Sequence, residues 1–253
     1  MVDRSVYVFT LSDVERSVYT KVDGPVYNEP MLTNSVPDKS QLSARERILV
    51  TAHDLFYREG IRATGIDRVI AESGVTKVTF YRHFPSKNLL TLAYLEYRHV
   101  LWMNWFRAAL LRHGCEHRGV AALPDALDEW LSDEHYRGCA FINAAVEFGS
   151  SMPDVMEICR GHKEDLVRVI AELLPPERSN PQLAEALAAA VDGACVHTQM
   201  GMSPALVRAG LETSIASLVG GVSRETATES SARTARRNSA RKANGAVKAT
   251  RRE

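Results

Sequence analysis

The feature that most constrains the fold is a short segment, residues 65–87, in which two helical patterns are separated by a glycine. The first pattern ends at Gly74, where a left-handed residue can end a helix without steric cost. Thr76 is placed to cap the second helix with its hydroxyl, and Pro85 ends that helix after Phe84. Two short helices joined by a tight turn that contains glycine are typical of a helix-turn-helix, whose second helix enters the major groove of DNA.

The second helix of this segment has one apolar and one polar side. If Val75, Phe80 and Phe84 face inward, the open side carries hydrogen-bond donors and cations, which suit phosphates and base edges. A helical hairpin with an ordinary solvated face has the same pattern, so the pattern alone leaves DNA binding and a plain hairpin both open. The residues on the open side are Thr76, Lys77, Thr79, Tyr81, Arg82 and His83.

A set of residues across this region also matches a known sequence pattern at the same spacings. They are Leu55, Phe56, Gly60, Thr64, Ile70, Ala71, Gly74, Val75, Thr76, Tyr81, Phe84, Ser86 and Lys87. On these residues, the region from Ala44 to Arg98 resembles the N-terminal domain of the TetR/AcrR family of transcriptional regulators. Two positions depart from the family pattern, because Gly65 stands where a second threonine is frequent and Val78 where a glycine is common. The missing threonine would remove one cap or phosphate contact.

The resemblance implies a function and a set of partners. The expected protein is a sequence-specific DNA-binding transcriptional regulator, a repressor that binds a palindromic operator as a homodimer and is released by a small apolar ligand. It implies a bacterial cytoplasmic location. Lys77 and Thr79 are expected at base edges, Tyr81 and Lys87 at phosphates, and Thr64 as a cap that also reaches a phosphate. The full set of expected DNA contacts is Arg45, Thr64, Gly65, Thr76, Lys77, Thr79, Tyr81, His83 and Lys87.

The rest of the chain predicts an all-α fold of about nine helices. Ser43 and Glu46 have the spacing of a capping box, and Pro124, Pro153 and Pro181 mark the starts of later helices. We expect an N-terminal three-helix helix-turn-helix domain followed by a C-terminal helical domain for ligand binding and dimerisation. The predicted boundaries are a disordered extension over 1–42, the DNA-binding domain over 43–99, the ligand-binding and dimerisation domain over 100–221, and a disordered basic tail over 222–253.

Two surfaces of the C-terminal domain have candidate roles. Its last two helices are rich in small residues, which in this family suit a four-helix dimer interface. Apolar and aromatic side chains with a single asparagine predict a ligand pocket, although the same residues also describe an ordinary core with one satisfied asparagine. The predicted pocket residues are Trp102, Met103, Trp105, Phe106, Phe141, Asn143, Phe148 and Met152.

Charge distribution suggests a second way to bind DNA. The formal net charge of the 253 residues is +0, but residues 222–253 carry nine basic and three acidic side chains, a net charge of +6. Such a tail can bind phosphates without sequence preference, so a sequence-independent DNA binder is the alternative function. The segment 43–99 has a net charge of +3, and residues 1–40 have a net charge of −2.

Other functional classes find little support in the sequence. No nucleophile elbow, phosphate loop, dinucleotide fingerprint or HExxH zinc motif is present, so we expect neither an enzyme nor a cofactor. Apolar runs fall short of the ~20 residues that a membrane span needs, so no membrane partner is expected. The cysteines lack CxxC spacing, which favours reduced thiols. A metal or redox sensor built on His113, Cys115 and His117 is a less favoured alternative, because so short a loop cannot surround one ion.

Overall fold

The computed structural model describes residues 41–176 and 180–220, and these residues form an all-helical fold without strands. The predicted all-α architecture is therefore confirmed. Residues 1–40 of the expected extension over 1–42, and the expected tail over 222–253, lie outside the described residues. Leu42 is described and is buried, so the expected disorder does not extend to it. The helices are α1 (Ala44–Glu59), α2 (Ile66–Ser73), α3 (Lys77–His83), α4 (Lys87–Arg112), α5 (Cys115–Arg118), η3 (Gly119–Ala122), α6 (Leu123–Leu131), α7 (Ala140–Phe148), η4 (Gly149–Ser151), α8 (Pro153–Glu172), α9 (Pro181–Gln199) and a last helix over residues 204–220.

The start of α1 has the predicted capping box. The Ser43 hydroxyl accepts the Glu46 N–H at 3.3 Å, and the Glu46 carboxylate accepts the Ser43 N–H at 2.8 Å. These two bonds satisfy amide groups that the first turn of a helix otherwise leaves free. The following apolar stripe, from Ile48 to Phe56, is buried. The sequence therefore fixes both where α1 begins and which side faces the core.

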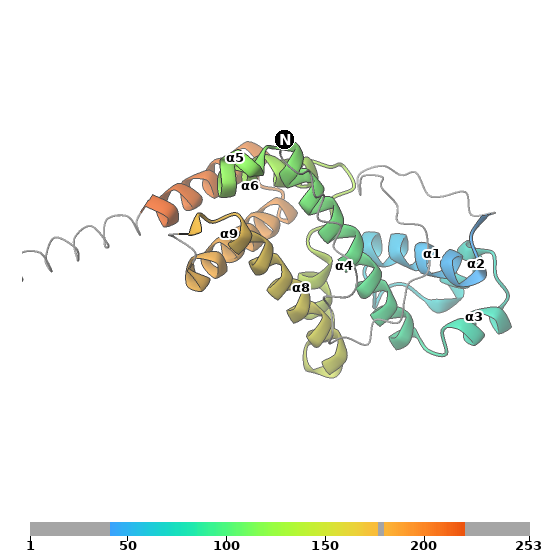
Figure 1. The fold of residues 1–253 in the computed structure, drawn as a ribbon. Helices are drawn as coiled ribbons and strands as arrows, with labels where there is room; N and C mark the ends of the chain where they lie inside the picture. Colours follow the sequence, from blue (N-terminus) through green and yellow to red (C-terminus); the bar gives the residue numbers. More distant parts are fainter. Residues whose placement is uncertain (1–40, 177–179, 221–253) are drawn as a thin grey trace, which may run out of the picture.

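The helices are arranged around the long α4. Helices α1, α2 and α3 lie at one end of the molecule, whereas α5, α6, α9 and the last helix lie at the other (Figure 1). Helix α4 runs between these ends and packs against α1, α6 and α8. Helix α4 therefore contacts helices of both halves.

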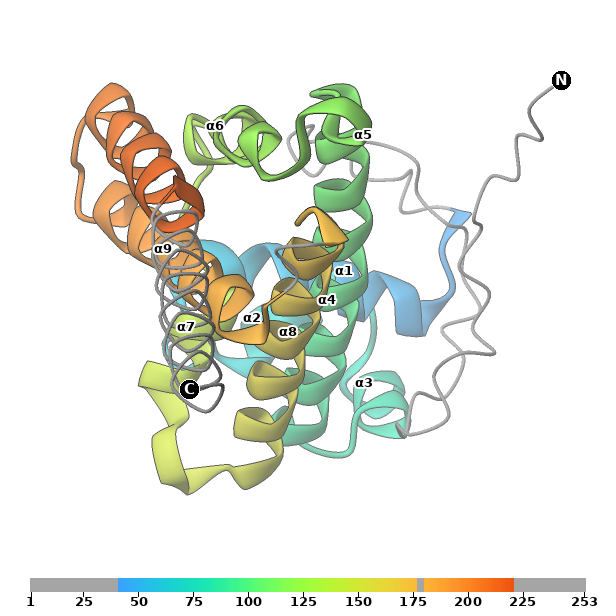
Figure 2. The same ribbon diagram turned by 60° about the vertical axis from the view of Figure 1, so that its left-hand side comes forward.

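The last helix, residues 204–220, lies beside α9 (Figures 1 and 2). Its apolar residues Val207, Leu211 and Ile215 are buried, and Arg208 forms an ion pair with Asp125 of α6. The opposite side of the last helix exposes mainly small residues, among them Ala209 and Gly210, and α9 exposes Ala189 and Gly193 alongside Glu185 and His197. The pair thus contributes to the core on one side and exposes several small residues on the other.

Candidate nucleic-acid interface

The turn between α2 and α3 has the predicted geometry. Gly74 ends α2 in the left-handed conformation, with φ 65°. The Thr76 hydroxyl then accepts the Thr79 N–H at 3.2 Å, so it caps α3 as expected. Helix α3 ends at His83, before Pro85. These local interactions hold α3 at a fixed angle to α2.

Helix α3 turns its apolar side toward α1 and its polar side outward. Phe80 and Phe84 are buried, as predicted, and both helices α1 and α2 pack against α3. On the outer side, Val78 is 71% exposed and Tyr81 is 43% exposed. The Lys77 side chain is 68% exposed. The outer surface of α3 is therefore free to enter a groove of DNA.

Several predicted contact residues surround this surface. The Lys77 Nζ lies 3.7 Å from the Asp67 carboxylate of α2, and both side chains are largely exposed. The Thr76 and Thr79 hydroxyls lie 2.9 Å apart. Arg45, at the start of α1, places its guanidinium carbon 5.1 Å from the centre of the Phe84 ring. Charges and hydroxyls from α1 and α3 therefore gather at one end of the molecule.

Gly65 and Thr64 precede α2 in different environments. Gly65 is the exposed N-cap of α2 and supplies no side-chain cap, as its departure from the family pattern predicts. Thr64 was predicted to cap α2, but Gly65 is the N-cap residue, so this prediction is wrong. The expected phosphate contact of Thr64 stays a prediction. The Thr64 side chain is buried, and its hydroxyl donates to the Gly60 carbonyl at 2.8 Å. Its hydrogen bond therefore shapes the loop between α1 and α2.

Lys87 begins α4 and is also turned toward this loop. Its Nζ donates to the Arg62 carbonyl at 3.2 Å. Loss of hydration lowers the pKa of Lys87, the Glu147 carboxylate opposes that shift, and the Arg62 charge adds to it. In this arrangement Lys87 supports the loop, and its expected phosphate contact stays a prediction.

Two arginines near the interface had no place in the predicted contact set. Arg82 is exposed in the last turn of α3, beside Tyr81, and its position on the open side of the helix was the available signal. Arg47 of α1 donates to the Ser73 carbonyl at 3.3 Å and to the Leu42 carbonyl at 2.9 Å. The first bond satisfies the C-terminal end of α2 and thereby joins α2 to α1.

The aromatic residues of the predicted ligand pocket belong to the hydrophobic core. The pocket interpretation is therefore wrong for these residues, and the core interpretation holds. Trp102 and Phe106 stack with ring centres 4.7 Å apart, and Trp105 packs beside them. These rings, Met103 and Phe141 are all buried. None of the five residues lines either cavity described below. They fill the space that was expected to hold a ligand.

The rest of the predicted pocket set is dispersed. Asn143 donates to the Arg137 carbonyl at 2.9 Å and accepts the Gln199 amide at 3.1 Å. Phe148 lies under the Arg62 guanidinium, and Met152 occupies the N-cap position of α8 without a side-chain hydrogen bond to it. Of the predicted set, Asn143 alone lines the cavity of about 620 Å³ that opens beside α7 among the described residues.

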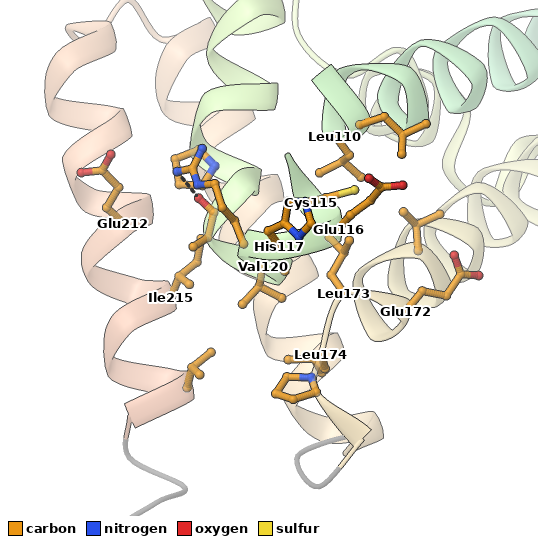
Figure 3. A pocket seen from close by; sticks show the side chains of 18 of the residues that line it. Leu110, Cys115, Glu116, His117, Val120, Glu172, Leu173, Leu174, Glu212 and Ile215 are labelled. Atoms are coloured by element: carbon orange, nitrogen blue, oxygen red, sulfur yellow. Dashed lines mark hydrogen bonds between the residues drawn. The ribbon is translucent and has the colours of Figure 1, made fainter. Parts of the chain in front are cut away.

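A larger cavity of about 1400 Å³ lies at the opposite end of the molecule from α3. Its walls come from the end of α4, from α5, from the end of α8 and from the last helix (Figure 3). Apolar side chains dominate its lining, with Glu116, Glu172 and Glu212 around them. Among the apolar residues are Leu110, Val120, Leu173, Leu174 and Ile215.

The loop considered as a metal site is not organised as one. Across the described residues, no three His, Cys, Asp or Glu side chains gather closely enough to hold a metal ion. The His113 Nε2 lies 2.7 Å from the Glu129 carboxylate, away from Cys115 and His117. Burial raises the pKa of the Cys115 thiol, and the Glu116 charge raises it further, which disfavours a reactive thiolate. The described residues thus give no support to the metal or redox alternative.

None of the helices among residues 41–176 and 180–220 combines the length and apolar character of a membrane span.

Comparisons with known proteins agree with the geometry of the interface. Residues 48–94 match the family model described as bacterial regulatory proteins, tetR family. The crystal structure of a TetR-family transcriptional regulator from Streptomyces coelicolor superposes with a TM-score of 0.64 at 31% identity, over 71% of this chain and 90% of that one.

Two curated relatives extend the comparison. An HTH-type transcriptional regulator from the lacX 3' region of Lactococcus lactis subsp. lactis is 27% identical over 137 residues, which are 52% of this chain and 68% of the relative. The HTH-type transcriptional activator FasR of Mycolicibacterium smegmatis is 41% identical over 56 residues, which are 22% of this chain and 25% of that protein.

Proposed function

Since this chain belongs to the TetR family and is a DNA-binding transcriptional regulator of the helix-turn-helix type, we propose that it binds a palindromic operator as a homodimer and represses transcription until a small ligand releases it. The observation that carries the proposal is the outward face of α3. There Lys77, Val78 and Tyr81 are exposed while Phe80 anchors the helix to the core. A rigid helix with an exposed polar side is what major-groove reading requires.

The surface formed by α9 and the last helix supports the proposed dimer. Small exposed residues such as Gly193 and Gly210 allow close approach of a second pair of helices, and Met200 and Leu206 add exposed apolar area. Packing each pair against its copy around a two-fold axis forms an isologous interface. The axis then relates two copies of α3, which suits half-sites separated by one helical turn or a multiple of it.

The cavity of about 1400 Å³ supports a ligand-responsive protein. Its mostly apolar walls fit a small apolar molecule, and the last helix, which also borders the proposed dimer surface, forms one of them (Figure 3). A ligand releases DNA only to the extent that it binds the released state more tightly than the operator-bound state. This cavity replaces the aromatic set around Trp102 as the proposed ligand site.

Selection of DNA from a random pool by the full-length protein tests the proposal. We expect a palindromic consensus, one dimer per selected duplex, and a clear preference over a scrambled duplex at moderate salt. Transcription from a template that carries the selected site should fall when the protein is added, whereas a rise would make it an activator. The alternative function predicts equal binding to all duplexes, a steep loss with salt, and loss of binding when residues 222–253 are deleted.

A further inference from the structure

The end of α1 is joined to the segment before α7 through Tyr57. The Tyr57 hydroxyl donates to the Gly138 carbonyl at 3.0 Å and accepts the Arg137 N–H at 3.1 Å. Its ring lies 4.0 Å from the guanidinium carbon of Arg98, which is buried on α4. A helix of the DNA-binding half is therefore bonded directly to the backbone of the C-terminal half.

A second connection joins α7 to the loop that leads from α1 into α2. Glu147, on α7, uses both carboxylate oxygens to accept consecutive backbone N–H groups, from Ile61 at 3.1 Å and from Arg62 at 2.7 Å. Hydrogen bonds to an ionised acceptor are stronger than neutral ones, and two together also fix orientation. Gly60 has φ 93°, a backbone conformation that other residues rarely adopt, and a Cβ there would meet the same carboxylate only at an ordinary contact distance of 3.4 Å.

The same loop is held from other directions as well. The Arg62 carbonyl accepts the Lys87 Nζ, and the Arg62 guanidinium lies over the Phe148 ring at 5.2 Å and donates to Ser151 at 3.2 Å. Helix α2 begins only a few residues later, at Ile66. The backbone of Arg62 thus connects α7, α4 and the helix-turn-helix.

The space between the two connections is open. The cavity of about 620 Å³ is lined by Tyr57, Gly60 and Ile61 on one side and by Asn143 and Glu147 on the other. Where side chains do not fill the interface, its geometry depends on the hydrogen bonds at its ends. A change in the position of α7 would therefore act first on the bonds of Glu147.

We propose that Glu147 is a positioning residue, which holds the helix-turn-helix in the operator-binding arrangement and transmits shifts of α7 to α2. The inference rests on the proposed function, because it names the contact through which a shift of the C-terminal helices would alter the position of the helix-turn-helix on the operator. In the arrangement described here, both carboxylate bonds are made. Displacement of α7 from the loop breaks them and lowers affinity for the operator.

The test compares Glu147→Gln with Glu164→Gln in the full-length protein. The glutamine at position 147 keeps the size of the side chain, but its amide oxygen alone can accept, so at least one of the two N–H groups loses its partner. The Glu164 side chain is exposed on α8 and forms no ion pair or hydrogen bond with a described residue, so its variant removes the same charge without these contacts. Both variants are first compared with wild type by thermal melting.

Two measurements are made on each protein. Hydrogen exchange over residues 57–66 should be faster by roughly tenfold or more at Ile61 or Arg62 in Glu147→Gln. Affinity for the duplex obtained by selection should fall by roughly fivefold or more, while affinity for a scrambled duplex stays constant. The Glu164→Gln protein should match wild type in both.

The outcomes separate this inference from the proposed function. Faster exchange with unchanged preference for the selected duplex would make Glu147 a structural contact only, and unchanged exchange would show that the bonds are not made in solution. In wild type, adding the selected duplex should slow exchange at Ile61 and Arg62, because coupling between two sites is reciprocal. No slowing would also overturn the inference. If selection yields no preferred sequence, the regulator proposal itself has failed.

Discussion

Replacing Lys77 by glutamine tests whether α3 reads base edges. Lys77 is the first residue of α3, its side chain is 68% exposed, and its ion-pair partner, Asp67, is 89% exposed at 3.7 Å. An exposed pair at this separation contributes at most about 1 kcal/mol to the free energy of unfolding. The variant should therefore melt close to wild type, so that any change in DNA binding reports on the interface.

The size of the binding change distinguishes two kinds of contact. A side chain that hydrogen bonds to a base edge discriminates the right base by about 1–3 kcal/mol, which is a factor of roughly 5 to 150 in affinity. A lysine that contacts only phosphate changes the slope of log affinity against log salt by about 0.9 and carries no sequence preference. We expect Lys77→Gln to lower the affinity for the selected duplex by roughly fivefold or more and to lower the affinity for a scrambled duplex by less.

Fluorescence anisotropy titrations of labelled duplexes at several salt concentrations provide the measurement. Arg160→Gln is the control, because the Arg160 side chain is exposed on α8 and forms no ion pair or hydrogen bond with a described residue. Equal losses on both duplexes, with the slope reduced by about 0.9, would assign Lys77 to phosphate and refute base reading. No loss on either duplex would remove Lys77 from the interface.

Three further predictions concern stability. Burial, and then the Arg98 charge, lower the pKa of His53 to about 3 from 6.5, so on acidification the unfolded chain binds the proton before the folded chain does. Thermal melts should show full stability above about pH 6.5, and the free energy of unfolding should fall by up to about 1.4 kcal/mol per pH unit below it. His53→Gln should reduce that pH dependence. Thr64→Val removes the hydrogen bond to the Gly60 carbonyl and should lower the free energy of unfolding in urea by about 1 kcal/mol; an equal loss of affinity for the selected and the scrambled duplex would support the expected phosphate contact of Thr64. Thr76→Ala removes the cap of α3 and should also cost about 1 kcal/mol, so an unchanged urea midpoint would contradict the cap.

Sequence patterns predicted best the features whose partners are a few residues away. Ser43 and Glu46 are three positions apart, and so are Thr76 and Thr79, so the spacing of each pair already specifies its bond. The turn at Gly74 is equally local, because it depends on the backbone freedom of one residue. This is why the start of α1 and the whole helix-turn-helix could be predicted without knowledge of the tertiary fold.

Features that depend on distant partners were missed or misassigned. Ile61 and Glu147 are 86 positions apart, and no periodic pattern marks a backbone N–H that will meet a carboxylate. The hydrogen bond from the Lys87 Nζ to the Arg62 carbonyl was likewise missed, because its two partners are 25 positions apart. Apolar pattern also cannot separate a pocket from a core, because both need the same side chains. Only the packing shows that Trp102 stacks on Phe106 and meets Trp130 in a T-shaped contact.

The buried Arg98 has a consequence for protein engineering. It is 4% exposed on α4, its guanidinium lies over the Tyr57 ring, and its Nη1 is 3.2 Å from the Nε2 of His53 on α1. A cation on α4 is therefore buried within the DNA-binding half. The Tyr57 hydroxyl below it donates to the Gly138 carbonyl, in the segment before α7. A chimaera that grafts residues 43–99 onto another regulator inherits that cation but loses the backbone partners of Tyr57 and the carboxylate of Glu147. Exchange of operator specificity between such proteins should succeed more readily by replacing the outer face of α3 than by exchanging whole domains.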